Sequence, residues 1–104
     1  MVNMIKVKIK YQDNRFVSLS ITGHANSAEK GKDLVCAATS AVVTGGFNSI
    51  KECENFKIEL EEGKAYIEAI KPISQHDEIV IETIISGLKT IEEENQKFIK
   101  IVKI

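Results

Sequence analysis

The residue types best suited to chemistry in this chain are a cysteine and a histidine twelve residues apart, Cys36 and His24. His24 comes soon after an alternating run, residues 16–22, that predicts a β-strand. Cys36 stands three residues after Asp33, which is a good helix N-cap and so predicts Cys36 at the third helical position. Unpaired backbone N–H groups and the positive end of the helix dipole stabilise a thiolate there and lower the cysteine pKa. A histidine at a neighbouring strand end can take the thiol proton or pair with the thiolate, as an activated nucleophile requires.

Each of these residues also has an interpretation without chemistry. A cysteine followed by two alanines in an apolar helix is commonly a small core residue, and a histidine in a polar loop commonly has no special role. Ser40 lies one turn after Cys36, so it either lines the same cleft or fixes the His24 loop. The alternative without chemistry is a hydrogen bond to the backbone one turn earlier. The segment 25–32 contains no large apolar side chain. We therefore expect a mobile loop that brings His24 to Cys36 when a substrate binds.

The second cysteine, Cys53, stands between two glutamates, whose negative charge raises a thiol pKa, and we expect it to be inert. A redox role for Cys36 would need Cys53 as its partner, with the two Cα atoms within about 7 Å. Together with His24 and His76, the cysteines make four metal ligands by count, yet none is paired at a zinc-binding spacing. No metal and no cofactor is therefore expected. The acids at 77 and 78 are typical of a helix N-terminus.

Length and charge restrict the classes of protein. The chain has 104 residues, of which 43% are hydrophobic and 28% charged, and this predicts one globular domain over residues 1–104. Lys and Arg together number 14 against 15 Asp and Glu, and Arg15 is the one arginine, so direct nucleic-acid binding is not expected. No apolar run is long enough to span a membrane. The first ten residues alternate lysines with aliphatics instead of forming a signal peptide, so we expect a cytoplasmic protein.

The elements that must position these residues follow from hydrophobic periodicity. Four short runs alternate between apolar and polar residues, which predicts two β-hairpins with one buried sheet face. Two longer segments carry apolar residues at helical spacing, and a last apolar run predicts a final strand. The predicted strands are 4–11, 16–22, 56–61, 64–70 and 98–104, and the predicted helices are 33–51 and 76–95. The order ββαββαβ predicts an α/β fold, a two-layer sandwich of a mostly antiparallel sheet with two helices on one face.

Two details of these elements bear on the site. The first helix is apolar almost all round, which predicts deep burial, and its Gly45-Gly46 pair is expected to loosen or bend it. On the second hairpin, Glu59, Glu61 and Glu62 are interpreted as a solvated outer sheet face, with attraction of a Lys-rich substrate segment as the alternative.

The motif between the second strand and the first helix resembles a known family. The string Gly23-His24-Ala25, followed by Gly31-x-Asp33-x-Val35-Cys36-Ala37-Ala38-x-Ser40, is similar to the signature of the ribosomal-processing cysteine protease family, Prp. The resemblance extends to the length and the order of elements. It implies that Cys36 is the nucleophile and His24 the base of a Cys–His dyad. Gly23, Asp33, Ala37 and Ser40 become candidates for supporting or substrate-binding roles, with Asp33 either catalytic or only a helix cap.

Members of that family remove a short N-terminal extension from the precursor of large-subunit ribosomal protein twenty-seven, cutting after an aromatic residue, and are described as dimers. The resemblance therefore implies a cysteine endopeptidase with a ribosomal-protein precursor as its peptide substrate and a homodimeric state. The alternative is a non-catalytic, ribosome-associated module that binds protein and merely retains the His–Cys pair.

Overall fold

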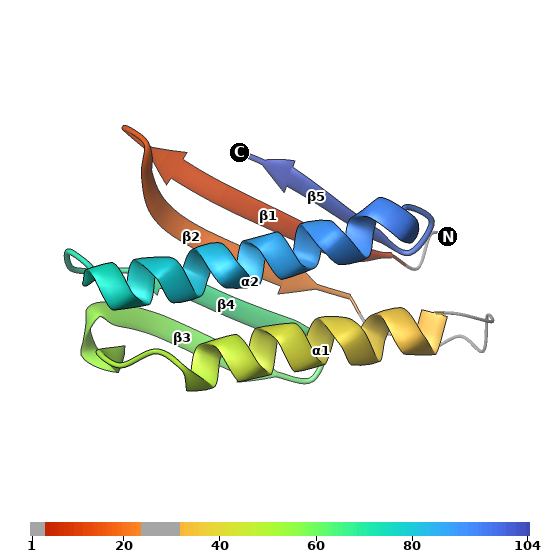
Figure 1. Cartoon of the computed structure of the whole chain (residues 1–104), viewed down its shortest axis with the longest axis horizontal. Coiled ribbons are helices and arrows are strands. Elements are labelled where there is room, and N and C mark those ends of the chain that lie inside the picture. Colours follow the sequence, from red (N-terminus) through yellow and green to blue (C-terminus); the bar gives the residue numbers. More distant parts are fainter. Residues whose placement is uncertain (1–3, 24–31) are drawn as a thin grey trace.

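The computed structural model describes residues 4–23 and 32–104, with the backbone alone for Lys32 and Asp33. Its elements are β1 (Ile5–Gln12), β2 (Arg15–Thr22), α1 (Lys32–Asn48), a short 3-10 helix η1 (Cys53–Asn55), β3 (Phe56–Glu61), β4 (Lys64–Ala69), α2 (Gln75–Glu94) and β5 (Ile99–Lys103). Figure 1 shows the two helices lying across the sheet. The observed order confirms the predicted ββαββαβ sandwich. No helix in the described ranges is long and apolar enough to cross a membrane.

The five strands form one mixed sheet in the order β3-β4-β2-β1-β5. All neighbours are antiparallel except β1 and β5, which are parallel. This pair is parallel because α2 carries the chain back along the sheet before β5 begins, whereas a tight hairpin joins only antiparallel strands. The first hairpin turns at Asp13 and Asn14, whose φ angles of 53° and 63° suit the twist of paired strands. The hairpin predicted from the first two alternating runs is confirmed.

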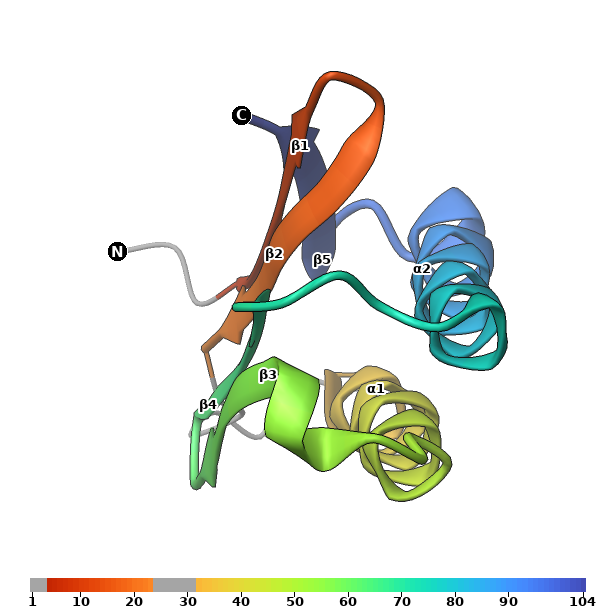
Figure 2. The ribbon, with the colours of Figure 1, turned by 90° about the vertical axis from the view of Figure 1, so that its left-hand side faces the viewer.

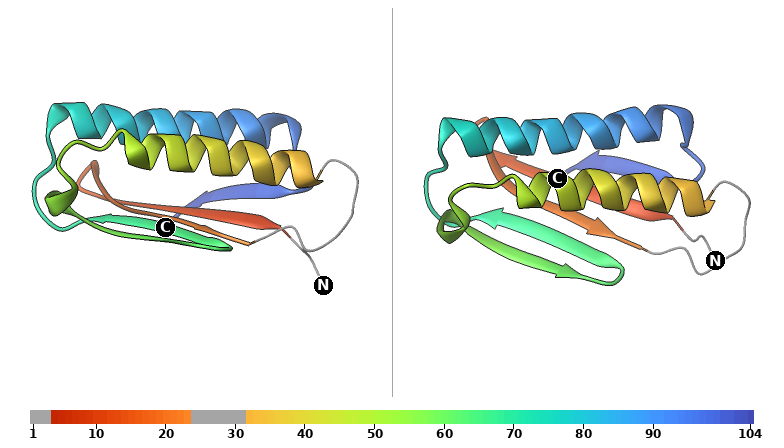
Figure 3. Two further views of the ribbon diagram at one scale, coloured as in Figure 1. Left: turned by 90° about the horizontal axis from the view of Figure 1, so that it is seen from below. Right: turned by 60° about the horizontal axis from the view of Figure 1, so that its bottom comes forward.

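Both helices cover one face of the sheet and leave the other face open, as the views in Figures 2 and 3 show. On β1 the residues Ile5, Val7 and Ile9 are buried beneath the helices, while the lysines that alternate with them are exposed. From the other layer, α2 contributes Ile84 and Leu88 to the same core. The prediction that only one sheet face is buried is therefore confirmed.

The first helix differs from its prediction at both ends. α1 begins at Lys32, so Asp33 lies inside the first turn and is not the N-cap, and Cys36 is the fifth helical residue instead of the third. An acid in the first turn is favoured by the helix dipole, which explains why Asp33 suits this position equally well. At its other end α1 stops at Asn48, short of the predicted residue 51.

The prediction of deep burial for α1 is wrong. Leu34 is 76% exposed, and the alanines at 37, 38 and 41 are exposed as well. The reason is that α1 contacts the sheet and α2 with one side only, so the opposite side of an almost wholly apolar helix faces outward. The apolar side chains on this exposed side therefore contribute nothing to the core of the single chain.

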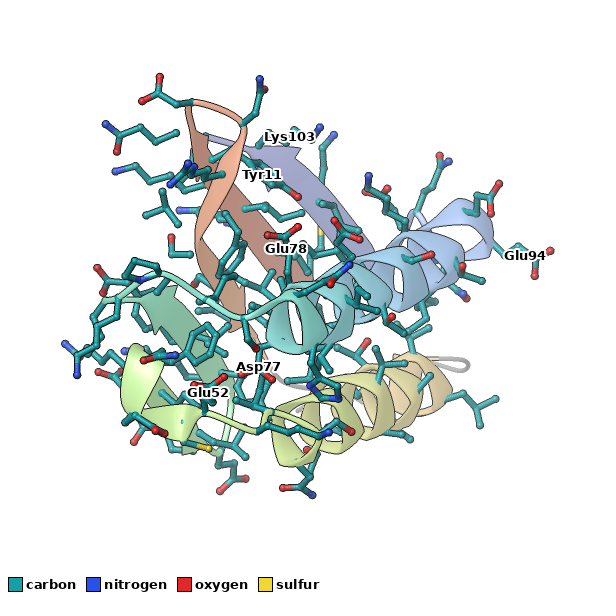
Figure 4. All side chains as sticks on the ribbon, turned by 60° about the vertical axis from the view of Figure 1, so that its left-hand side comes forward. Tyr11, Glu52, Asp77, Glu78, Glu94 and Lys103 are labelled. Carbon is teal, nitrogen blue, oxygen red and sulfur yellow. The ribbon has the colours of Figure 1, made fainter. Side chains whose placement is uncertain are left out.

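A buried carboxylate joins the end of α1 to the start of α2. Asp77 is 0% exposed and accepts hydrogen bonds from the backbone N–H groups of Lys51 at 2.9 Å and Glu52 at 3.0 Å. Its oxygen also lies 3.0 Å from His76 Nδ1. Figure 4 shows Asp77 beside Glu52, between the start of α2 and the segment that follows α1. Asp77 is thus a tertiary link, and not only the acidic helix start that the sequence predicts.

The environment of Asp77 also determines its charge. Burial alone would raise the pKa of this carboxyl, but the donors from Lys51, His76 and Glu52 outweigh burial and hold the pKa below its ordinary value. The carboxyl is therefore ionised at neutral pH, and its acceptor oxygens remain available to both backbone donors.

The two helices approach closely at glycines. α1 runs without interruption through Gly45 and Gly46, so the expected bend is not observed. A Cβ on Gly46 would overlap the side chain of Ile84, and one on Gly87 would lie 3.0 Å from Val42 Cγ1. Gly46 is therefore needed for packing against α2, while Gly45 has nothing within 4 Å of its Cβ position.

This contrast predicts opposite effects for neighbouring substitutions. Gly46→Ala forces the buried Ile84 to move and should destabilise the fold by about 1–3 kcal/mol. Gly45→Ala adds a methyl group in open space inside a helix and should stabilise it by about 0.5–1 kcal/mol. Urea unfolding midpoints of the two variants measure both effects, and equal shifts of the same sign would contradict the packing role of Gly46.

Candidate active site

A cleft of about 380 Å³ opens between the first half of α1 and one end of the sheet. One wall is formed by Cys36, Thr39, Ser40 and Val43 of α1, and the facing wall by the β3–β4 turn at residues 60–65. Gly23 lies in the cleft directly after β2. The end of β2 and the first half of α1, which are the two ends of the motif, therefore meet at this cleft. The β3–β4 hairpin, which is distant from the motif in sequence, lines it as well.

Cys36 reaches this cleft from just beyond the first turn of α1. Its side chain is half-buried and packs against the hydrophobic core while lining the cleft. The unpaired amides of a helix belong to its first residues, and the favourable field of the dipole extends over the first turn. Cys36 is the fifth helical residue and follows these amides directly, two positions later than the sequence predicts, so the helix stabilises its thiolate less than at the predicted position.

Gly23 is the residue from which the chain leaves β2. Its φ is +116°, and a Cβ there would lie 2.6 Å from the carbonyl oxygen of Met4. Its N–H donates to the Gly63 carbonyl at 3.1 Å, which ties the end of β2 to the β3–β4 turn. Only glycine satisfies this conformation and this close approach together. Gly23 therefore shapes the cleft through its backbone.

The other candidates from the sequence fall in different places. Ser40 lines the cleft with Cys36, which confirms that the two share one helix face. Ala37 is exposed and is absent from the cleft walls. Asp33 belongs to the first turn of α1, and its side chain is outside the described part of the structure. His24 and the segment 25–31 are also outside the described residues, so the dyad and the mobile loop stay predictions.

The hairpin wall is the part of the site that the sequence indicated only through the alternative interpretation of its glutamates as a substrate contact. Leu60, Glu61 and Glu62 line the cleft, whereas the interpretation as a solvated outer face holds for Glu59. Glu59 pairs with Lys64 at 2.9 Å, and this hydrogen bond lowers the pKa of Glu59. No sequence signal places this turn opposite α1, since its position results from the pairing of β4 with β2.

Cys53 lies far from the cleft. It belongs to η1, beyond the opposite end of α1 from Cys36 (Figure 1), and its side chain is exposed. The helical rise between Cys36 and Asn48 alone is about 18 Å, whereas a disulfide needs Cα atoms within about 7 Å. A redox pair of these two cysteines is therefore excluded.

A thiol near the start of a helix, in a cleft with an apolar base and a polar rim, is an arrangement suited to a cysteine nucleophile. Comparison with known proteins gives the same class. The family model described as cysteine protease Prp matches residues 4–100. The ribosomal processing cysteine protease Prp of Bacillus subtilis is 36% identical to this chain over 100 residues, which cover 88% of this chain and 89% of that protein.

Solved structures share the fold. The essential ribosomal processing protease Prp from S. aureus in complex with a substrate peptide superimposes with a TM-score of 0.79 and 26% identity. The same protease with a covalently linked product peptide gives a TM-score of 0.81 and 28% identity. Each comparison covers 97% of this chain and 100% of the other. The chain belongs to the Prp family of cysteine proteases.

Proposed function

We propose that this chain is a ribosomal-processing endopeptidase that removes the N-terminal extension from the precursor of large-subunit ribosomal protein twenty-seven by cutting after an aromatic residue. The observation that carries the proposal is the position of Cys36 in the cleft. The S. aureus protease of the same fold has been crystallised with a covalently linked product peptide. A covalent product peptide is what a nucleophilic cysteine leaves during peptide hydrolysis.

In the proposed mechanism, the Cys36 thiolate attacks the carbonyl carbon of the scissile bond. Amides at the start of α1 stabilise the oxyanion that forms. His24 donates a proton to the leaving amine as the C–N bond breaks, which leaves a thioester on Cys36. His24 then takes a proton from water, the resulting hydroxide attacks the thioester, and the acid product departs as the thiolate is restored.

The walls of the cleft suit the proposed specificity. Ile5, Ile21, Val43 and Ala65 line it and are themselves buried, so they present an apolar surface at its base. A pocket of a few hundred Å³ with an apolar base binds a large apolar side chain by removing that side chain from water. This supports an aromatic residue before the scissile bond.

The proposal is tested with a synthetic peptide that copies the precursor's N-terminal extension and the first residues of the mature protein. We expect one cleavage, after an aromatic residue, detected as two products by mass spectrometry. A peptide with that aromatic residue replaced by Gly is the matched control and should remain intact. If the B. subtilis relative cuts the native peptide under conditions in which this chain does not, the proposed function is wrong.

The environment of Cys36 predicts a difference in reactivity between the two cysteines. We expect Cys36 to react with iodoacetamide faster than Cys53, with the difference largest near neutral pH, because a thiolate is the reacting form and Cys36 lies near the start of a 17-residue α-helix, whereas Cys53 begins a 3-10 helix of three residues. Peptide mapping after timed alkylation separates the two sites. Equal rates across pH 6–9 would contradict activation of Cys36.

We also propose that two copies of the chain form a homodimer. The open face of the sheet and the exposed side of α1 around Leu34 are the surfaces that support this. A single chain has a mass of 11.6 kDa. Light scattering at micromolar concentration should give twice this mass, and the mass of one chain would exclude the dimer.

A further inference from the structure

The face of α1 that packs on the sheet contains one polar residue. Val35, Thr39, Val43 and Phe47 recur at every fourth position, so they form one row along the helix. All four are buried, and Thr39 is only 5% exposed. Valine has almost the same shape as threonine and would complete the apolar row. The hydroxyl of Thr39 is therefore not explained by the packing of the helix.

The Thr39 hydroxyl also differs from the threonines of α2 in its hydrogen bonding. On α2, Thr83 donates to the Ile79 carbonyl at 2.8 Å and Thr90 to the Ser86 carbonyl at 2.9 Å, one turn back in each case. Thr39 Oγ1 is buried and has no hydrogen-bond partner in the structure as far as it is described. A buried polar group without a partner is costly, so a native structure that retains one calls for an explanation.

The position of Thr39 in the cleft supplies such an explanation. Thr39 lines the cleft one turn after Cys36, and the buried residues that line it with Thr39 are Ile5, Ile21, Val43 and Ala65. Among these five side chains, Thr39 carries the one polar atom. A peptide seated at Cys36 would meet this buried apolar base of the cleft, where the Thr39 hydroxyl is the group that can donate or accept a hydrogen bond.

We propose that Thr39 is a substrate-binding residue whose hydroxyl forms a hydrogen bond with the peptide substrate in the cleft. This inference rests on the proposed peptidase function and adds a residue to it. The bond satisfies the buried hydroxyl only when the substrate is present. The partner is a hydrogen-bonding group of the peptide, supplied by its main chain or by the side chain that enters the apolar base of the cleft.

The test compares Thr39→Val, which removes the hydroxyl at nearly constant shape, with Thr39→Ser, which retains it. Each is assayed on two peptides that differ only in Phe or Tyr before the scissile bond. We expect Thr39→Val to lower kcat/KM about three- to tenfold, as loss of one neutral hydrogen bond would. Thr39→Ser should keep most of the wild-type value. Thr83→Val, on the other helix, is the control and should leave kcat/KM unchanged.

The two peptides distinguish the sources of the bond. Equal loss on both identifies a main-chain partner, and loss confined to the Tyr peptide identifies the side chain. Thermal unfolding should show Thr39→Val at least as stable as wild type, because it removes an unpartnered buried hydroxyl. If Thr39→Val cuts both peptides at the wild-type kcat/KM, the inference is wrong. If wild type cuts neither peptide, it is the proposed function that fails.

Discussion

Replacing Cys36 by Ala is expected to abolish cleavage of the precursor peptide, lowering kcat/KM by at least about a thousandfold. The thiolate forms the covalent bond on which both halves of the proposed mechanism depend, and loss of a nucleophile commonly costs several orders of magnitude. Because Cys36 is half-buried and Ala is only slightly smaller, the fold should persist. The measurement is product formation by mass spectrometry over hours, at enzyme concentrations high enough to detect slow turnover.

The same chain offers a matched control for this prediction. Cys53→Ala removes the other thiol, which is exposed beyond the far end of α1, and should leave cleavage unchanged. Peptide binding by Cys36→Ala, followed by fluorescence polarisation, separates the enzyme from the alternative of a binding module. Cleavage by Cys36→Ala at the wild-type rate would contradict its role as nucleophile. Binding without cleavage in wild type and variants alike would favour the binding module.

Replacing Asp77 by Ala should destabilise the protein by about 2–4 kcal/mol, the largest effect on stability that we expect from one residue. The substitution removes the charged acceptor of the Lys51 and Glu52 N–H groups, and each part-buried hydrogen bond to a charged group contributes about 1.5–3 kcal/mol. A domain of this size has a total stability of about 5–15 kcal/mol. Urea unfolding gives the change directly, and Glu78→Gln, an exposed acid of the same helical turn, is the control, with a change below about 1 kcal/mol. A similar loss in both variants would contradict the specific link made by Asp77.

The charge of Asp77 also predicts how stability depends on pH. Its pKa is lowered in the folded state, so the unfolded chain binds the proton more readily. The contribution is fully present above the ordinary carboxyl pKa of about 3.9 and is lost as pH falls through the lower folded pKa. Urea midpoints should therefore decline below about pH 4 more steeply for wild type than for Asp77→Asn. Parallel pH profiles would assign the acid sensitivity to other carboxyls.

The sequence predicted the order of elements because alternation and helical spacing are local patterns. It did not predict that β5 lies beside β1, since strand order depends on how α2 crosses the sheet. The error at the start of α1 has a local cause, because an Asp is favoured both as a cap and in the first turn. Burial of α1 was overestimated because composition does not reveal how many neighbours a helix has.

For the site, the motif located Gly23, Cys36 and Ser40, which the fold brings to one cleft. It did not locate the wall formed by Leu60 and its neighbours, because sheet pairing brings that turn to α1 from a distant part of the sequence. Thr39 had a detectable signal, a polar residue in a row of apolar ones at every fourth position. That signal becomes informative only when burial and the missing hydrogen-bond partner are known.

The cleft and the link made by Asp77 lie at opposite ends of α1, separated by most of the length of the helix. Free-energy changes at sites so far apart generally add. The chain can therefore change its substrate preference at the cleft residues around Cys36 while its stability is adjusted independently near residues 45, 51 and 52. A protease engineered for another peptide would lose stability at the cleft end, and a substitution such as Gly45→Ala at the other end would restore it without touching the new specificity.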